Sequence, residues 1–325
     1  MSANRASPRT QVILAFLSVY IIWGSTYLAI RFAVATMPPF LMAGVRFLIA
    51  GAILYLLVRL RGAERPKLVH WRSALIVGGL LLFCGNGGVS WAEVQVPSGL
   101  AALLVAVVPL WMALFDWLRP GGVYPGALAI VGLIIGFAGV ALLASQAESS
   151  GTGPQLAGIL ALVVATCCWA IGSLYARNAP FPKTQLLGTG MEMLAGGAVL
   201  VFVAGITGEW GQVHFAAISV KSLLALAFLI VFGSLIAFSA YVWLLHHVSA
   251  VSVSTYAYVN PVVAVFLGWA FADEAITWVT LVSAAIIISA VALITVARAR
   301  GAQPQQVTAP AGDDSTAPAE AIAQR

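Results

Sequence analysis

Ten apolar runs, each long enough to cross a bilayer as a helix, take up most of this 325-residue chain and constrain its fold more than any other feature. Residues are 61% hydrophobic and only 8% charged, a balance typical of membrane proteins. Because lipid offers no partners to the backbone, each run must satisfy its own N–H and C=O groups as a helix. The sequence therefore predicts an all-α polytopic membrane protein. The predicted spans are 12–34, 40–60, 73–94, 98–118, 124–144, 155–177, 185–206, 221–245, 250–272 and 276–297.

Basic residues gather at one side of these predicted spans. They are Arg5, Arg9, Arg59, Arg61, Arg65, Lys67, Arg72, Arg119, Arg177, Lys183, Arg298 and Arg300. The opposite loops carry Glu148, Glu209, Asp273 and Glu274, with Lys221 as the one basic exception. Cytoplasmic loops are the ones enriched in Lys and Arg, so both termini are expected in the cytoplasm. The net charge of +5 therefore reflects basic residues in the predicted cytoplasmic loops, and we predict no nucleic-acid partner.

The first apolar run could also be taken for a signal peptide. It continues through Trp23, Tyr27 and Arg31 without a convincing small-residue cleavage site, so we expect a retained first span. The cysteines Cys84, Cys167 and Cys168 lie within apolar segments, and the four histidines lie outside them. Neither set has metal-ligand spacing, so we predict no metal and no cofactor.

The chain repeats itself once. At an offset of 146 residues Trp23 matches Trp169, and Arg31 matches Arg177. The offset later becomes 152 and pairs Trp91 with Trp243 and Pro109 with Pro261. Each half has five spans, an odd number, so the second half must enter the membrane from the opposite side, as in many secondary transporters. We expect a cytoplasmic tail over 1–11, one repeat over 12–144, an inverted repeat over 155–297 and a disordered tail over 301–325.

Two spans carry a proline near the centre. Pro261 frees a backbone carbonyl and follows a hydroxyl-rich stretch, and Pro109 lies at matching depth in the other half. Broken polar helices at the membrane midplane are how many transporters build a substrate site. We therefore predict helix breaks at both prolines and a substrate cavity beside them. Its predicted lining is Asn86, Trp91, Trp111, Ser254, Tyr256, Tyr258 and Asn260. Plain helix packing is the alternative reading for the two tryptophans.

A charge within a span or at its end is costly and marks a functional candidate. Arg46, Glu93 and Glu192 are the candidates for ion coupling or gating. The alternative for Arg46 is an external salt bridge, and for Glu192 a structural pair with Arg177 or Lys183. Repeat symmetry matches Arg46 with Glu192, but inversion puts the two at opposite depths, so a direct pair is not expected.

Three short motifs carry a family resemblance. They are Trp23-Gly24-Ser25-Thr26-Tyr27, the run from Val96 to Ala102 followed by Pro109, and the run from Ser254 to Ala264. The chain resembles the drug/metabolite transporter superfamily, with two EamA-type halves over about residues 10–298, and the last two motifs resemble most a branch of bacterial inner-membrane transporters. This resemblance implies ten helices around a central cavity, alternating access, and small metabolites as cargo. It also implies that amino acids or their derivatives are frequent cargo, and that export is the frequent direction.

The sequence thus favours a secondary transporter in the bacterial inner membrane, with lipid and a small metabolite as its partners. A channel is the alternative, and a membrane-embedded enzyme is a less favoured one, because the spans carry no carboxylate cluster and no Ser–His pair. Carboxylates within spans allow proton coupling without requiring it. Gly132, Gly136 and Gly139 form a small-residue ridge that can pack helices within one chain or between the subunits of a homodimer.

Overall fold

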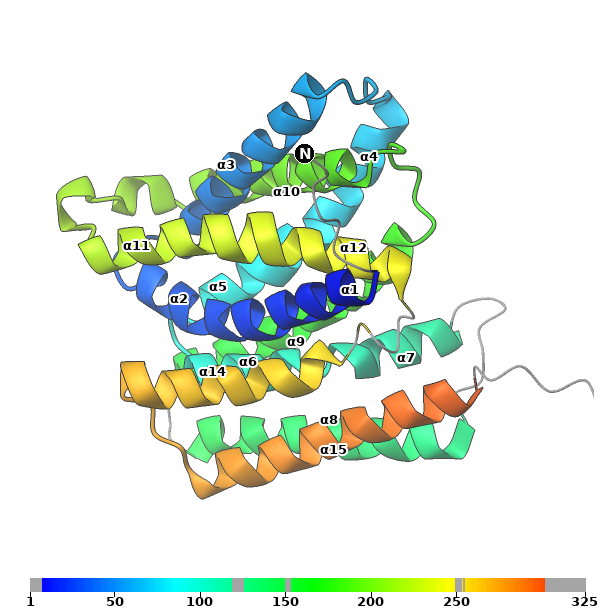
Figure 1. The fold of residues 1–325 in the computed structure, drawn as a ribbon. Coiled ribbons are helices and arrows are strands. Elements are labelled where there is room, and N and C mark those ends of the chain that lie inside the picture. The colour runs from blue at the N-terminus through cyan, green and yellow to red at the C-terminus, as the bar shows by residue number, and fades with distance from the viewer. Residues whose placement is uncertain (1–7, 119–125, 150–152, 249–252, 254, 302–325) are drawn as a thin grey trace, which may run out of the picture.

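The computed structural model of the chain describes residues 8–118, 126–149, 153–248, 253 and 255–301, and all regular structure in these residues is helical (Figure 1). Nine helices in this part are long and apolar enough to cross a membrane, and Tyr256–Ala272 is a shorter tenth. The predicted all-α multi-pass fold is confirmed. Ser254 and the tail beyond Gly301 lie outside the described residues.

Five spans are single helices. They are α3 (Pro39–Leu60), α8 (Gly126–Ser149), α9 (Gly153–Ala176), α10 (Gln185–Ile206) and α15 (Trp278–Gly301).

Three spans contain a π-helical middle. The first is α1 (Pro8–Leu17), η1 (Ser18–Trp23) and α2 (Gly24–Val34). The third is α4 (Leu68–Val77), η2 (Gly78–Gly87) and α5 (Gly88–Ala92). The eighth is α11 (Val220–Phe228), η5 (Leu229–Phe238) and α12 (Ser239–His247). Wide π-turns inside α-helices are frequent at functional sites.

The two proline-containing spans behave differently. The fourth span is interrupted at Ala106 and Val107 between α6 (Ser98–Val105) and α7 (Val108–Leu118), just before Pro109. In the ninth span, α14 (Tyr256–Ala272) runs through Pro261 without interruption. The neighbouring α2 packs tightly against α14 at this level, since a Cβ on Gly24 would lie 3.3 Å from the Asn260 carbonyl oxygen. Packing of this kind holds a helix together across the hydrogen bond that a proline removes.

The two repeats meet most closely where α3 crosses α10 (Figure 1). A Cβ on Gly51 would lie 2.8 Å from the Leu194 nitrogen, and one on Gly197 would lie 2.9 Å from the Leu48 nitrogen. Backbones can approach this closely only where side chains are absent, which is the role of small residues in membrane helices. The two helices run antiparallel, so residues near the start of one lie beside residues near the end of the other.

Carboxylates cap helix N-termini at the acidic end of the bundle. This end consists of loops 35–38, 93–97, 207–219 (with the short helices Glu209–Gln212 and Phe215–Ala217) and 273–277. The basic end consists of loops 61–67 and 177–184, where Glu64 accepts a hydrogen bond from the Lys183 N–H and links the two loops. At the acidic end Glu209 accepts hydrogen bonds from the backbone N–H groups of Phe40 and Leu41, and Glu274 does so from Ser98 and Gly99. Such carboxylates satisfy N-terminal N–H groups and favour the positive end of the helix dipole.

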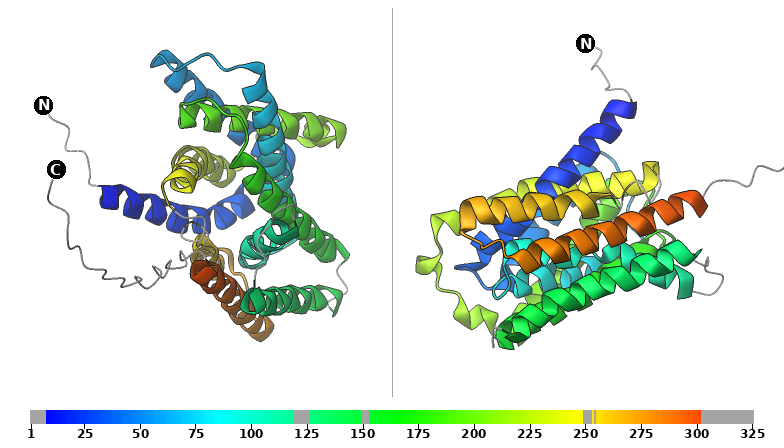
Figure 2. Two further views of the ribbon diagram at one scale, coloured as in Figure 1. Left: turned by 90° about the vertical axis from the view of Figure 1, so that its right-hand side faces the viewer. Right: turned by 90° about the horizontal axis from the view of Figure 1, so that it is seen from below.

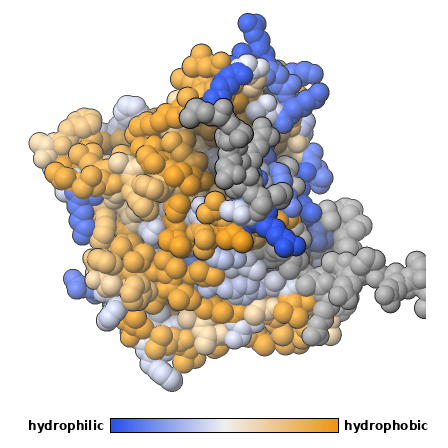
Figure 3. Space-filling model, in the orientation of Figure 1, coloured by the Kyte–Doolittle hydropathy of each residue, from blue (hydrophilic) through white to orange (hydrophobic). Residues whose placement is uncertain are grey.

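The outer surface suits a lipid environment. Leu14, Phe202 and Phe266 each expose more than half of their surface, and hydrophobic side chains cover much of the face in Figure 3. α1 projects from the bundle in both views of Figure 2. The ridge Gly132, Gly136 and Gly139 packs within the chain, mainly against α15, with which α8 forms a layer at one side of the molecule (Figure 1).

Candidate functional site

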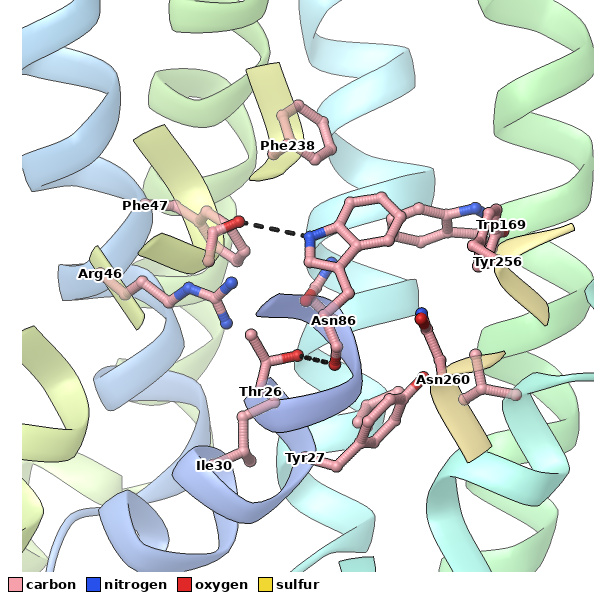
Figure 4. Close-up of a pocket in the computed structure, with 14 residues that line it drawn as sticks. Thr26, Tyr27, Ile30, Arg46, Phe47, Asn86, Trp169, Phe238, Tyr256 and Asn260 are labelled. Atoms are coloured by element: carbon pink, nitrogen blue, oxygen red, sulfur yellow. Dashed lines mark hydrogen bonds between the residues drawn. The ribbon is translucent and has the colours of Figure 1, made fainter. Parts of the chain in front are cut away.

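A small cavity lies between the two halves, where the π-helical segments come together. It has a volume of about 70 Å³ and takes lining residues from seven of the ten spans. Trp23 comes from η1, Asn86 from η2 and Gly233 from η5, so each of the three wide-turned segments contributes. We call this the first cavity (Figure 4).

Among the described residues that line the first cavity, Arg46 is the only charged one. Its side chain is 3% exposed, and its guanidinium points into the cavity (Figure 4). Nε donates to the Ser234 hydroxyl over 2.9 Å, and the guanidinium carbon lies 4.6 Å from the centre of the Phe47 ring. Nη1 has no hydrogen-bond partner, and no carboxylate in the described part of the chain forms an ion pair with Arg46. A buried cation without a counter-ion is costly, so this geometry provides for an anionic group from outside the chain.

Two amide side chains face the same space (Figure 4). Asn86 donates weakly through Nδ2 to the Leu81 carbonyl, at 3.4 Å. Asn260 is 4% exposed, and its Oδ1 has no partner in the described residues. Buried polar atoms are normally hydrogen-bonded, so an unpaired amide oxygen in a cavity marks a place for a ligand's donor group. Together with Arg46, the amides can bind a small group that has both acceptors and donors.

Aromatic rings close one side of the first cavity. The ring centres of Trp23 and Trp169 lie 5.9 Å apart in an edge-on arrangement, and Trp23 lies 5.5 Å from Tyr256 in the same geometry. Tyr241 joins the cluster at 4.8 Å from Trp23. The Trp23 indole is fixed by its hydrogen bond to the Gly233 carbonyl, at 3.3 Å. This aromatic layer offers an apolar wall to a ligand and separates the first cavity from the basic end.

A second and larger cavity lies on the other side of this layer. Its volume is about 340 Å³, and it reaches Arg177 and Lys183 at the basic end. Glu192 lines it and is 7% exposed. Neither basic residue forms an ion pair with Glu192. Phe238 belongs to the lining of both cavities, so the two spaces are neighbours.

The structure brings together some of the predicted site residues and separates others. Asn86, Tyr256 and Asn260 line the first cavity with Arg46. Trp111 lies elsewhere, where its indole donates to Thr166 over 3.1 Å. The other predicted residues that the structure describes are also outside this lining. Tyr258 donates to the Val291 carbonyl at 2.8 Å, Trp91 is partly buried in α5, and Pro109 and Pro261 are buried beside other helices.

Glu93 follows α5 at the acidic end and lies outside the first cavity. Its carboxyl group is fully buried, and neither oxygen has a hydrogen-bond partner among the described residues. Arg31 reaches the backbone carbonyl of Glu93, at 2.8 Å, rather than its side chain. Arg31 and Glu93 thus lie together at the acidic end, whereas Arg46 faces the cavity.

Several lining residues were not among the predicted site residues. Trp23, Thr26, Tyr27, Trp169 and Phe238 all face the first cavity. The equivalent positions of Trp23 and Trp169 in the two repeats were the sequence feature that could have indicated their place in the lining. A matched pair whose members contact each other lies near the axis that relates the halves, which is also where a central cavity forms.

A bundle of ten apolar helices in two halves, with a polar and aromatic cavity between them, is the architecture of a membrane transport protein. The EamA-like transporter family model matches residues 10–145 and 156–296, and the chain belongs to this family.

Relatives extend over nearly the whole chain. It is 41% identical over 286 residues to the uncharacterized inner membrane transporter YedA of Escherichia coli (strain K12), covering 87% of this chain and 90% of YedA. It is 28% identical to the uncharacterized transporter YvbV of Bacillus subtilis (strain 168), over 88% of this chain and 91% of YvbV. A solved crystal structure matches with a TM-score of 0.63 at 21% identity, over 90% of this chain and 99% of the other, which shows the shared fold.

Proposed function

We propose that this protein is a secondary transporter that moves small metabolites with a carboxylate group, amino acids or their derivatives foremost, across the bacterial inner membrane. The proposed membrane follows the relative YedA, which is described as an inner membrane transporter. The positive-inside rule supports both termini in the cytoplasm, and the basic end as the cytoplasmic end. The observation that carries the cargo proposal is the buried guanidinium of Arg46 in a central cavity, where no counter-ion from the described residues pairs with it and its Nη1 has no hydrogen-bond partner.

In this proposal Arg46 holds the substrate carboxylate. A charge-assisted hydrogen bond to a guanidinium is about twice as strong as a neutral one, and the cavity keeps water away from it. Asn86 and Asn260 supply further hydrogen bonds, and Trp23 and Tyr256 give an apolar wall to the substrate side chain. Alternating access follows when the two halves rearrange so that the cavity opens first to one end and then to the other. Proton coupling through Glu93 or Glu192 and downhill facilitated flux both fit this scheme.

The test is counterflow in proteoliposomes. Vesicles containing the full chain are preloaded with a mixed amino-acid pool, and labelled aromatic, aliphatic and hydroxy amino acids are added one at a time. We expect saturable, competed accumulation of at least one class. Arg46→Gln should raise its KM about tenfold or more, since a hydrogen bond to a charged group contributes about 1.5–3 kcal/mol. Arg46→Lys keeps the charge and should lose less.

The matched control is Arg61→Gln, which removes an exposed cation at the basic end and should leave KM unchanged. Thermal unfolding of each purified variant separates a lost binding group from a lost fold. An Arg46→Gln protein that is folded and transports amino acids with wild-type KM would refute the proposed site. Absence of counterflow across the panel would refute the proposed cargo.

A further inference from the structure

The second cavity is the repeat counterpart of the first. At the offsets of 146 and 152 residues that align the two halves, six residues lining one cavity match six residues lining the other. The pairs are Tyr27 and Ser173, Ile30 and Ala176, Arg46 and Glu192, Asn86 and Phe238, Val89 and Tyr241, and Gly233 and Leu81. The offsets were set by other residues, so they were not chosen to produce this match. The two cavities therefore use equivalent positions of the two halves.

The backbone supports this alignment independently. The π-helical segments η2 and η5 are both ten residues long, and they occupy equivalent places in the third and eighth spans. The matched pair Trp23 and Trp169 is in direct contact, with ring centres 5.9 Å apart. A pair of equivalent residues that touch each other lies on the axis relating the repeats. The two tryptophans therefore lie at the junction between the two cavities.

The two chambers differ in the sign of their deepest charge. Arg46 and Glu192 each lie seven residues after the first residue of a 22-residue helix, α3 or α10. At 1.5 Å per residue each is about 10 Å along its helix, but from opposite ends of the bundle because the helices are antiparallel. Both halves thus carry a buried charge at this position, and the two charges have opposite signs.

The surroundings of Glu192 leave its carboxylate available. Two of the polar side chains in this lining are engaged elsewhere, since Thr189 donates to the Gln185 carbonyl and Gln185 donates to the Val242 carbonyl. The cations Arg177 and Lys183 are exposed at the mouth of the cavity, where water screens them. Glu192 has no hydrogen bond or ion pair in the described residues. The inner part of the second cavity therefore favours a cation.

We propose that the second cavity is a binding station for the cationic group of a dipolar substrate, with Glu192 as its counter-ion. This proposal rests on the proposed transport function. In it, Glu192 and Arg46 are two specificity-determining residues on one substrate path, and the Trp23–Trp169 pair lies between them. The volumes agree with such a route. The second cavity, at about 340 Å³, has room for a small metabolite, whereas the first, at about 70 Å³, must widen to take one. A substrate with both an ammonium and a carboxylate group is matched at each station in turn.

The test measures the charge preference of each cavity without knowing the substrate. Single cysteines are introduced as Ser173→Cys in the second cavity and Thr26→Cys in the first, in the full chain with Cys84, Cys167 and Cys168 replaced by serine. Each protein, in proteoliposomes, is treated with two methanethiosulfonates of similar size, one with a trimethylammonium group and one with a sulfonate group. The readout is the ratio of the cationic to the anionic modification rate. Each ratio is compared between proteins that carry the same introduced cysteine and differ only in the tested charge. The exposed cations at the mouth of the second cavity then affect both proteins equally.

We expect Glu192→Gln to lower this ratio at Ser173→Cys about tenfold, and Arg46→Gln to raise it at Thr26→Cys by a similar factor. The reason is that a nearby charge, little screened by water, attracts the reagent of opposite sign and repels the other. Asp273→Asn is the control. It neutralises an exposed carboxylate outside both cavities, and asparagine tolerates its left-handed backbone, with φ of 51°. This variant should leave both ratios unchanged.

A ratio at Ser173→Cys that Glu192→Gln leaves unchanged would overturn the second station. Failure of both reagents to modify Thr26→Cys from either side would also contradict the proposal, because the first cavity would then never open to a ligand. These failures are distinct from failure of the proposed cargo. That failure appears as absent amino-acid counterflow in the wild type, whatever the modification ratios are.

Discussion

Two adjacent glycines give a sharp test of the packing that forms the second cavity. Gly78 and Gly79 begin η2, the π-helical segment of the third span. A Cβ on Gly78 would lie 2.5 Å from the Glu192 carbonyl oxygen and 2.8 Å from the Gly196 nitrogen, whereas a Cβ on Gly79 has nothing within 4 Å. The two positions have almost the same local backbone. Alanine should therefore act oppositely at them.

The magnitude follows from the contact distances. Ordinary contact begins at 3.4 Å, so Gly78→Ala must move η2 and α10 apart by about 0.9 Å, the difference between 3.4 and 2.5 Å. The obstructing atoms are backbone and cannot rotate away. Overpacking of this kind costs about 1–3 kcal/mol. Gly79→Ala meets no obstacle and gains up to about 1 kcal/mol of helix propensity.

The assay is thermal unfolding of the two purified variants in the same detergent, beside the wild type. We expect Gly78→Ala to lower Tm by about 2–6 °C, taking about 2 °C per kcal/mol for a chain of this size, and Gly79→Ala to keep or raise it. Equal Tm values for the two variants would show that η2 and α10 do not approach as described. The geometry of the second cavity would then have to be revised.

Three further predictions concern single side chains. Glu274→Ala should lower stability by about 1–2 kcal/mol, because two N–H groups at the start of α6 lose their acceptor, whereas Asp273→Asn should not; equal Tm values would refute the capping role. Tyr258→Phe should cost about 1 kcal/mol in thermal unfolding and leave transport KM unchanged, since its hydroxyl donates to α15 and not to the cavity; a changed KM would place it at the site. Asn260→Ala should reduce flux while membrane insertion stays intact, and unchanged transport kinetics would remove Asn260 from the site.

The fold was predictable because hydropathy is a strong signal over a whole span. Each apolar run in the described residues forms a helix close to its predicted bounds, and the interruption before Pro109 follows from the proline itself. The repeat could be aligned because bulky or rigid residues, such as Trp23 and Trp169, stand out against an apolar background. These features depend on the local sequence and on the solvent, and both can be read without a structure.

The lining of the site was only partly predictable, because it depends on how each helix is rotated about its own axis. Tyr256 and Tyr258 are two residues apart and therefore point in very different directions from α14. Nothing in the local sequence favours one of them, yet only Tyr256 faces the cavity, while the Tyr258 hydroxyl donates to a backbone carbonyl of α15. The same holds for Trp111, whose indole finds Thr166 on α9.

The π-helical turns add to this difficulty. A π-turn takes in an extra residue and shifts the phase of every side chain after it. In the third span Asn86 and Glu93 share a face of an ideal α-helix, but in the structure only Asn86 reaches the cavity. No simple residue pattern predicts such a turn. The segments η1, η2 and η5 nevertheless determine which residues face the first cavity.

The central claim, that this protein carries a small metabolite by alternating access, is tested most directly by trans-stimulation. Uptake of a labelled amino acid is measured in proteoliposomes that are either empty or loaded with the same unlabelled amino acid, over a range of external concentrations. A carrier predicts saturable uptake that is faster into loaded vesicles, because the loaded site returns more readily. Uptake that rises linearly with concentration and ignores the internal load would contradict the account and indicate a channel.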